Sequence, residues 1–154
     1  RDLHSFPTRR SSDLRTLVWV EEMLPRPQLI AVLSVSNVCV CPSVYEPLGI
    51  VNLEAMAVDL PVVGSATGGI PDVIVDGETG FLVPIDQVQD GTGTPKDPDR
   101  FEADLAERLT TLVMDESRAK EMGIAARKRV EDHFAWSAIA ERTMKVYDWV
   151  LAQG

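Results

Sequence analysis

The chain has 154 residues, a formal net charge of −9 and a hydrophobic fraction of 45%. This length and composition are typical of a soluble domain with a core of its own. The acidic balance argues against non-specific binding to nucleic acid or to an anionic membrane surface. The apolar runs are short and interrupted, so the sequence predicts no membrane-spanning helix.

The first fourteen residues differ in character from the rest. Residues 4–14 (His-Ser-Phe-Pro-Thr-Arg-Arg-Ser-Ser-Asp-Leu) resemble the translation of a common short-read sequencing adapter over their whole length. The alternative is a natural polar arm. We expect residues 1–14 to be an artefactual, disordered segment, with natural sequence missing before Arg15. Residues 15–154 are then expected to form a partial domain.

Short apolar runs alternate with helical patterns in the first half of that domain. The runs predict strands at residues 16–20, 38–41, 61–65 and 80–83. The intervening segments predict helices at residues 28–36, 49 or 50 to 58, and 70–75. This alternation with short connections indicates an α/β fold, a doubly wound, Rossmann-like parallel sheet.

Three further helices are expected after a surface loop at residues 86–97 that is rich in Gly, Thr, Asp and Pro. Asp97 and Pro98 are a capping residue and a first helical residue, and an apolar stripe follows them. The stripe consists of Phe101, Leu105, Leu109, Leu112 and Val113. The second and third helices are expected over residues 117–131 and 137–151.

Cys39 and Cys41 are the only cysteines. Residues two apart on a strand are poorly placed for a disulfide, and two thiolates do not make a zinc site. We expect both thiols to be reduced packing groups, which agrees with a cytoplasmic protein.

Glu46 and Glu54 flank the predicted start of a helix. Ligands of open α/β folds bind at the carboxyl ends of strands, where the loop containing Glu46 begins. We expect free N–H groups at Gly49, Ile50 and Val51 to suit a pyrophosphate. A carboxylate accepts two hydroxyl hydrogen bonds, so each Glu suits a sugar diol. The alternative is a pair of surface carboxylates favoured by the helix dipole.

A second glycine-containing turn, residues 66–71, also lies between a strand and a helix. Gly68 and Gly69 either line the same cleft or only make a tight turn. The turn lacks the third glycine and the spacing of a dinucleotide fingerprint.

Residues 42–84 resemble the C-terminal half of retaining glycosyltransferases of family 4, which have two Rossmann-like domains (the GT-B architecture). Four motifs carry this resemblance: the E-x7-E pair Glu46 and Glu54, the Glu-Pro-Leu-Gly-Ile core at 46–50, Gly-Gly-Ile-Pro-Asp at 68–72, and residues 76–83. The resemblance extends over about residues 17–151. Within the family, residues 44–57 are most similar to actinobacterial-type glycogen synthases and α-maltose-1-phosphate synthases. Such enzymes move glucose from ADP-glucose to an α-glucan or to glucose 1-phosphate.

The resemblance implies roles for individual residues. Glu46 is the implied catalytic residue and contacts the donor sugar, while Glu54 holds the ribose diol. The remaining implied donor-binding residues border the sugar or shape the phosphate site: Ser43, Tyr45, Pro47, Leu48, Gly49, Ile50, Gly68 and Gly69. Transfer is expected to retain configuration by front-face attack, with the leaving diphosphate stabilised electrostatically and Glu46 not acting as a nucleophile.

The resemblance also implies partners. We expect a nucleotide-sugar donor, a glucan or sugar-phosphate acceptor and the missing N-terminal domain of the same chain. No further cofactor and no metal ion is expected, since His4 and His133 are unsuitable ligands. The last helix should face the missing domain and leave Tyr147 and Trp149 exposed. The fragment alone is expected to be inactive.

Other functions stay open at this stage. The chain could serve a GDP- or UDP-sugar transferase acting on a lipid or small molecule. It could also be a non-catalytic nucleotide-sugar-binding module, or part of an epimerase or hydrolase on the same architecture.

Overall fold

A parallel three-stranded sheet forms the centre of the protein. The computed structural model describes residues 18–153. The strands β1 (Cys39–Cys41), β2 (Val62–Ser65) and β3 (Gly80–Val83) pair in the order β1-β2-β3. Cys39 is in register with Val62, and Val62 with Gly80. Because every strand is parallel and every connection is helical, the predicted doubly wound α/β class is confirmed.

Six helices accompany the sheet within the described residues, and all of them were predicted. They are α1 (Arg26–Ser34), α2 (Ile50–Met56), α3 (Ile70–Val73), α4 (Pro98–Met114), α5 (Glu116–His133) and α6 (Trp136–Leu151). Their ends differ from the expected ones by a few residues. At the start of α4, the carboxylate of Asp97 accepts a hydrogen bond from the N–H of Arg100 at 3.0 Å, as the capping pattern predicts.

One predicted element is wrong where it can be examined. The strand expected at residues 16–20 is absent over Val18, Trp19 and Val20, which carry no regular structure and are exposed. A strand needs a neighbouring backbone to pair with, and no described strand pairs with these residues. Thr16, Leu17 and the expected adapter segment lie outside the described residues.

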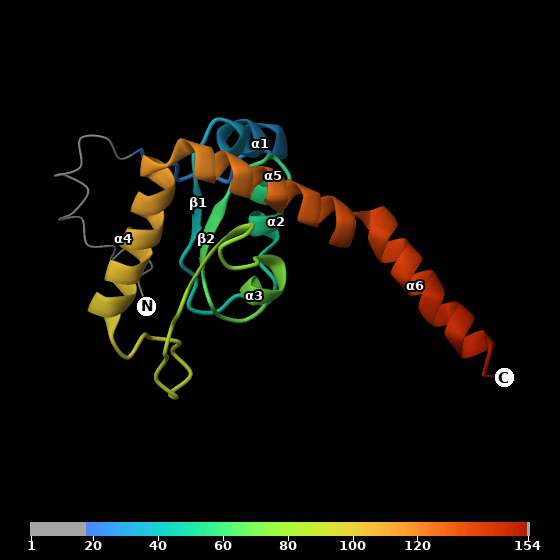
Figure 1. Ribbon diagram of the computed structural model, residues 1–154. Helices are drawn as coiled ribbons and strands as arrows, with labels where there is room; N and C mark the ends of the chain where they lie inside the picture. Colours follow the sequence, from blue (N-terminus) through green and yellow to red (C-terminus); the bar gives the residue numbers. More distant parts are fainter. Residues whose placement is uncertain (1–17, 154) are drawn as a thin grey trace.

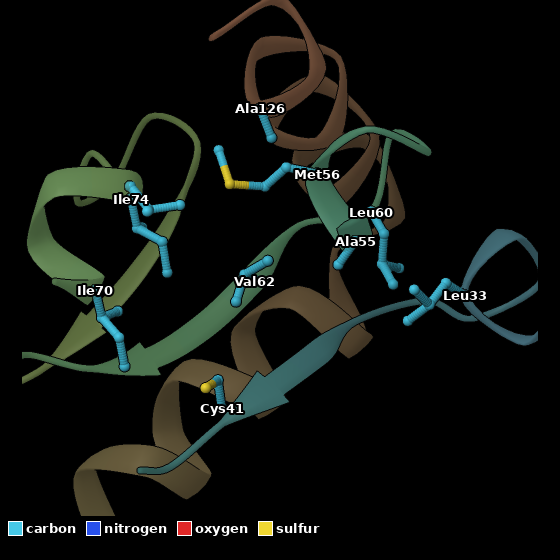
Figure 2. Packing of buried hydrophobic residues seen from close by; sticks show 10 residues of the cluster. Leu33, Cys41, Ala55, Met56, Leu60, Val62, Ile70, Ile74 and Ala126 are labelled. Atoms are coloured by element: carbon cyan, nitrogen blue, oxygen red, sulfur yellow. The ribbon is translucent and has the colours of Figure 1, made fainter. Parts of the chain in front are cut away.

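Side chains on the first face of the sheet pack under α1, α2 and α3. Figure 2 shows Val62 of β2 between Ile70 and Ile74 on one side and Ala55 and Leu60 on the other. All five are at most 3% exposed. The cluster therefore fixes α2 and α3 against the strands that precede them.

The second face of the sheet packs against α4 and α5. Val63 alternates with Val62 along β2 and joins Phe81, Val83 and Leu112 in a separate cluster. Helix α5 contributes to both clusters, because Ala126 belongs to the first and Met122 to the second. Of the predicted α4 stripe, only Val113 points away, with 63% of its surface exposed.

Helix α6 projects away from the rest of the molecule, as the red ribbon in Figure 1 shows. None of its residues is buried. Tyr147 and Trp149 are 58% and 65% exposed, which confirms the expectation of uncovered apolar surface. Among residues 18–153, no helix is both long and apolar enough to cross a membrane.

The two cysteines are free thiols, as predicted. Cys41 is buried and Cys39 is half-buried. Burial, reinforced by the neighbouring Cys41, raises the pKa of the Cys39 thiol to about 11.

Candidate functional site

The loops that follow β1 and β2 are joined by hydrogen bonds at the carboxyl ends of these strands. The hydroxyl group of Ser65, the last residue of β2, donates to the carbonyl oxygen of Ser43. The N–H of Gly69 donates to the carbonyl oxygen of Glu46 at 2.9 Å. The glycine-containing turn at residues 66–69 thus lies against the loop that carries Glu46. The sequence left open whether this turn lines the same cleft or only makes a tight turn, and the hydrogen bonds establish that the two loops are neighbours.

The backbones of the two loops approach each other so closely that no side chain fits at the two glycines of the second loop. A Cβ atom at Gly68 would lie 1.9 Å from the carbonyl oxygen of Glu46. A Cβ atom at Gly69 would lie 2.3 Å from the carbonyl oxygen of Pro47. Real Cβ atoms do not approach oxygen this closely, so both positions require glycine for packing.

Glu46 folds back onto the start of α2. Its Oε1 accepts the N–H of Gly49 at 3.0 Å. The expectation of a free N–H at Gly49 is therefore wrong, because this carboxylate satisfies it within the loop. Among the described residues, no backbone group accepts from the N–H of Ile50 or Val51. These two N–H groups at the start of α2 therefore remain available for the anion that the sequence predicts there.

Gly49 also holds a special conformation directly before α2. Its φ of 86° lies in the left-handed region, which favours glycine. A Cβ atom here would lie 2.5 Å from Nδ2 of Asn52. The requirement for glycine at this position therefore has two independent causes.

Sequence reasoning missed Asn52. It is fully buried, and neither Nδ2 nor Oδ1 has a hydrogen-bond partner in the described part of the chain. A buried amide without partners destabilises a fold by roughly 1–3 kcal/mol. The only signal in the sequence that points to Asn52 is its position inside the E-x7-E element, three residues after Gly49.

Glu54 lies on the second turn of α2, and a cation from another helix approaches it. Nη2 of Arg26 in α1 lies 3.9 Å from Oε1 of Glu54, with 77% and 25% of the respective side chains exposed. The sequence pattern does not predict this pair. A contact of this length with an exposed arginine holds neither group firmly, so Glu54 can exchange it for a ligand.

The other predicted donor residues surround Glu46 in two groups. Ser43 is half-buried, and its hydroxyl lies 3.4 Å from the Sγ of Cys41, so it contributes to holding the loop. The side chains of Tyr45, Pro47, Leu48 and Ile50 are exposed. These four side chains are therefore accessible, whereas Ser43 and Glu46 are half-buried and Gly49 is buried.

A hairpin within residues 86–96 lies against the loop that follows β1. Nε2 of Gln87 donates to the carbonyl oxygens of Val44 and Gly93, at 2.5 and 2.7 Å. Between the hairpin and the loop after β1 lies a pocket of about 330 Å³. The pocket is lined by Val44, Tyr45, Thr67, Gln87, Val88, Gln89, Gly91, Thr92 and Gly93. The sequence predicts only a surface loop for this segment.

Within residues 18–153, no group of three or more His, Cys, Asp or Glu side chains is arranged to hold a metal ion. His133 is the last residue of α5.

Comparison with known proteins identifies the family. Residues 18–129 match the model described as glycosyl transferases group 1. α-Maltose-1-phosphate synthase from Mycolicibacterium smegmatis is 50% identical over 134 residues, covering 87% of this chain and 33% of that protein. Glycogen synthase from Mycobacterium tuberculosis is 33% identical, covering 80% of this chain and 27% of that protein.

The fold comparison agrees. Sucrose-phosphate synthase from Thermosynechococcus elongatus superimposes with a TM-score of 0.72 and 33% identity, covering 94% of this chain and 33% of that chain. The chain thus spans between about a quarter and a third of the length of these three relatives. It belongs to the group 1 glycosyl transferases, and its fold is that of a GT-B glycosyltransferase domain.

Proposed function

We propose that this chain is the donor-binding part of a retaining family 4 glucosyltransferase that moves glucose from ADP-glucose to an α-1,4-glucan or to glucose 1-phosphate in glycogen synthesis. The observation that carries the proposal is the bonded pair of loops around Glu46 at the carboxyl ends of β1 and β2. The 50% identity to an α-maltose-1-phosphate synthase supports it.

Each part of the donor has a proposed partner. The sugar hydroxyls bind Glu46, whose Oε2 is not used in the bond to Gly49. The diphosphate lies at the N–H groups of Ile50 and Val51, near the positive end of α2. The ribose diol binds the carboxylate of Glu54 in place of Arg26.

The proposed transfer retains configuration by attack on the face that the diphosphate leaves. Backbone N–H groups aimed at the departing diphosphate stabilise the charge that develops on it. A paired-carboxylate mechanism would need both Glu46 and Glu54 across one glycosidic bond, and Glu54 is assigned to the ribose instead.

The donor is tested by binding to the chain itself. ADP-glucose, UDP-glucose and GDP-glucose are titrated separately into the ¹⁵N-labelled chain, and backbone shifts are followed. We expect ADP-glucose to bind most tightly and to shift Gly49, Ile50 and Val51. Tighter binding of UDP- or GDP-glucose would replace the proposed donor.

Catalysis is tested in a complete enzyme that contains this domain. Glu46→Ala should lower turnover by roughly 100-fold or more, the loss typical of one positioned transition-state contact. The matched control is Glu102→Ala, which removes an exposed carboxylate from α4. An unaltered rate in Glu46→Ala would reject the assignment of Glu46. If nucleotide sugar binds but the complete enzyme transfers nothing to any acceptor, the domain is a binding module.

A further inference from the structure

We infer that the pocket between the β1–α2 loop and the hairpin at residues 86–96 binds a neutral sugar unit of the acceptor. The inference rests on the proposed function, since it assigns the acceptor side of the same site. The volume of about 330 Å³ lies at the lower end of the roughly 300–1,000 Å³ range of small-molecule sites. It therefore suits one or two sugar rings rather than a long chain.

The chemistry of the lining selects an uncharged, hydroxyl-rich ligand. None of its nine residues carries a charged side chain. Tyr45, which is 78% exposed, offers an aromatic face on which the apolar side of a sugar ring can stack. Within residues 18–153, no hydrogen bond uses the hydroxyl groups of Tyr45 or Thr67 or the side-chain carbonyl of Gln89, so all three remain available to sugar hydroxyls.

The hairpin that forms one wall is held in place before any ligand arrives. Lys96 and Asp86 close its base, with a backbone hydrogen bond of 2.7 Å and an ion pair of 3.0 Å. Gln87 ties it to the loop after β1 through the carbonyl oxygen of Val44. Since the wall is already ordered, a sugar does not have to order it on binding.

The tip of the hairpin has its own support. The Asp90 carboxylate accepts from both the N–H and the hydroxyl group of Thr92, at 2.9 and 2.6 Å. The Thr92 hydroxyl also lies 2.8 Å from the hydroxyl of Thr94. These contacts occupy Thr92, so we assign the available hydrogen-bonding groups of the pocket to Tyr45, Thr67 and Gln89.

The location of the pocket indicates the acceptor rather than the donor, so Tyr45, which the family resemblance counts among the donor-binding residues, is reassigned to the acceptor. Tyr45 directly precedes Glu46, and Thr67 directly precedes Gly68, so the pocket borders the proposed donor-sugar site. None of the residues proposed for the diphosphate or the ribose lines it. A sugar bound in this pocket lies next to the proposed position of the donor glucose. An acceptor must occupy such a position to receive the transferred glucose.

The test is a titration of the ¹⁵N-labelled 154-residue chain with maltotriose as the neutral α-glucan probe. We expect shifts at Thr67, Gly91 and Gly93 and weak, saturable binding. Tyr45→Ala should weaken this binding by roughly fivefold, as expected for one lost stacking contact. Tyr147→Ala removes the other tyrosine, on α6, and should leave the affinity unchanged.

Four outcomes would overturn the inference. The first three are the absence of shifts at the pocket, equal affinity in Tyr45→Ala, and competition between maltotriose and ADP-glucose for the same resonances. The fourth comes from a parallel titration with glucose 6-phosphate, since binding tighter than that of maltotriose would reject a neutral ligand. The shifts that ADP-glucose causes at residues 49–51 are measured separately from the maltotriose shifts. Failure of maltotriose to bind the pocket would therefore leave the donor assignment intact. Failure of ADP-glucose to bind would likewise leave the pocket assignment intact. Each variant must first give the wild-type spectrum away from its substitution; if Tyr45→Ala does not, Gln89→Ala replaces it with the same expected loss.

Discussion

The carbonyl oxygen of Glu46 accepts the N–H of Gly69 at 2.9 Å, and this bond joins the loops after β1 and β2. The side chain of the same residue accepts the N–H of Gly49 at 3.0 Å. Glu46 therefore connects the second loop to the start of α2 through its main chain and its side chain. Its position therefore depends on residues in both loops, among them Gly49 and Gly69, whose side chains carry no functional group.

Gly68→Ala tests this dependence. The new Cβ would lie 1.9 Å from the carbonyl oxygen of Glu46, so one loop must move. Gly77→Ala is the matched control, because Gly77 also has a positive φ but no atom within 4 Å of an added Cβ. Both substitutions carry the left-handed cost of roughly 1–2 kcal/mol. Gly68→Ala should lower the free energy of unfolding by roughly 1–3 kcal/mol more.

Urea unfolding of the two variants measures this difference. The ¹⁵N spectrum should also show displaced signals at Glu46 and Gly49 in Gly68→Ala alone. Equal losses of stability in both variants would mean that the loops are not packed as described.

Substitution of Glu46 separates its structural contribution from its proposed role. Glu46→Ala removes the acceptor for the Gly49 N–H and should lower the free energy of unfolding by about 1 kcal/mol. Glu46→Gln keeps an oxygen acceptor and should lose less. Both variants should weaken ADP-glucose binding, because only a carboxylate accepts two hydroxyl donors without offering a donor of its own. Calorimetric binding at wild-type strength in Glu46→Gln would show that the charge has no part in donor recognition.

The contact between Arg26 and Glu54 leads to the prediction that only the substitution of Glu54 weakens nucleotide binding. At 3.9 Å, with Arg26 largely exposed, the pair should contribute less than about 1 kcal/mol to stability. Arg26→Ala should therefore leave the unfolding midpoint nearly unchanged and should not weaken ADP-glucose binding. Glu54→Gln should be equally stable but bind the nucleotide less well. Weaker binding in Arg26→Ala would instead make the arginine a donor contact.

The elements that the sequence predicted correctly have strong local signals. β2 and β3 read as short apolar runs, and both are almost entirely buried, as strands covered on two faces must be. The start of α4 was predictable because a capping Asp and a Pro are adjacent. The segment 18–20 has an equally apolar sequence, but none of the described strands β1–β3 pairs with it, and strand pairing cannot be predicted from composition.

The site was predictable only in part, for a similar reason. Glu46, Gly68 and Gly69 were recognisable from their motif and its place between strand and helix. The bond from Gly49 to Glu46 depends on a side-chain rotamer, and the burial of Asn52 depends on packing around α2. The pocket wall depends on Gln87 reaching Val44, 43 positions away in the sequence.

Cys39 leads to a prediction about pH. Burial, reinforced by Cys41, raises the pKa of its thiol from 9.0 to about 11, so between these values the folded chain retains a proton that the unfolded chain loses. Stability must therefore fall as pH rises through this window, with a slope that approaches about 1.4 kcal/mol per pH unit. Below pH 9 both states are protonated and Cys39 contributes no slope.

The measurement compares urea unfolding of the wild type and Cys39→Ala from pH 8 to pH 11. Other groups titrate in this range, but they are common to both proteins, so the difference isolates Cys39. The gap in unfolding free energy should change steadily above pH 9, in favour of the variant. A constant gap would mean that the Cys39 thiol titrates alike in both states and is more accessible than its half-buried position on β1 implies. Alkylation with iodoacetamide at pH 8 provides a second readout, since a raised pKa leaves little thiolate to react.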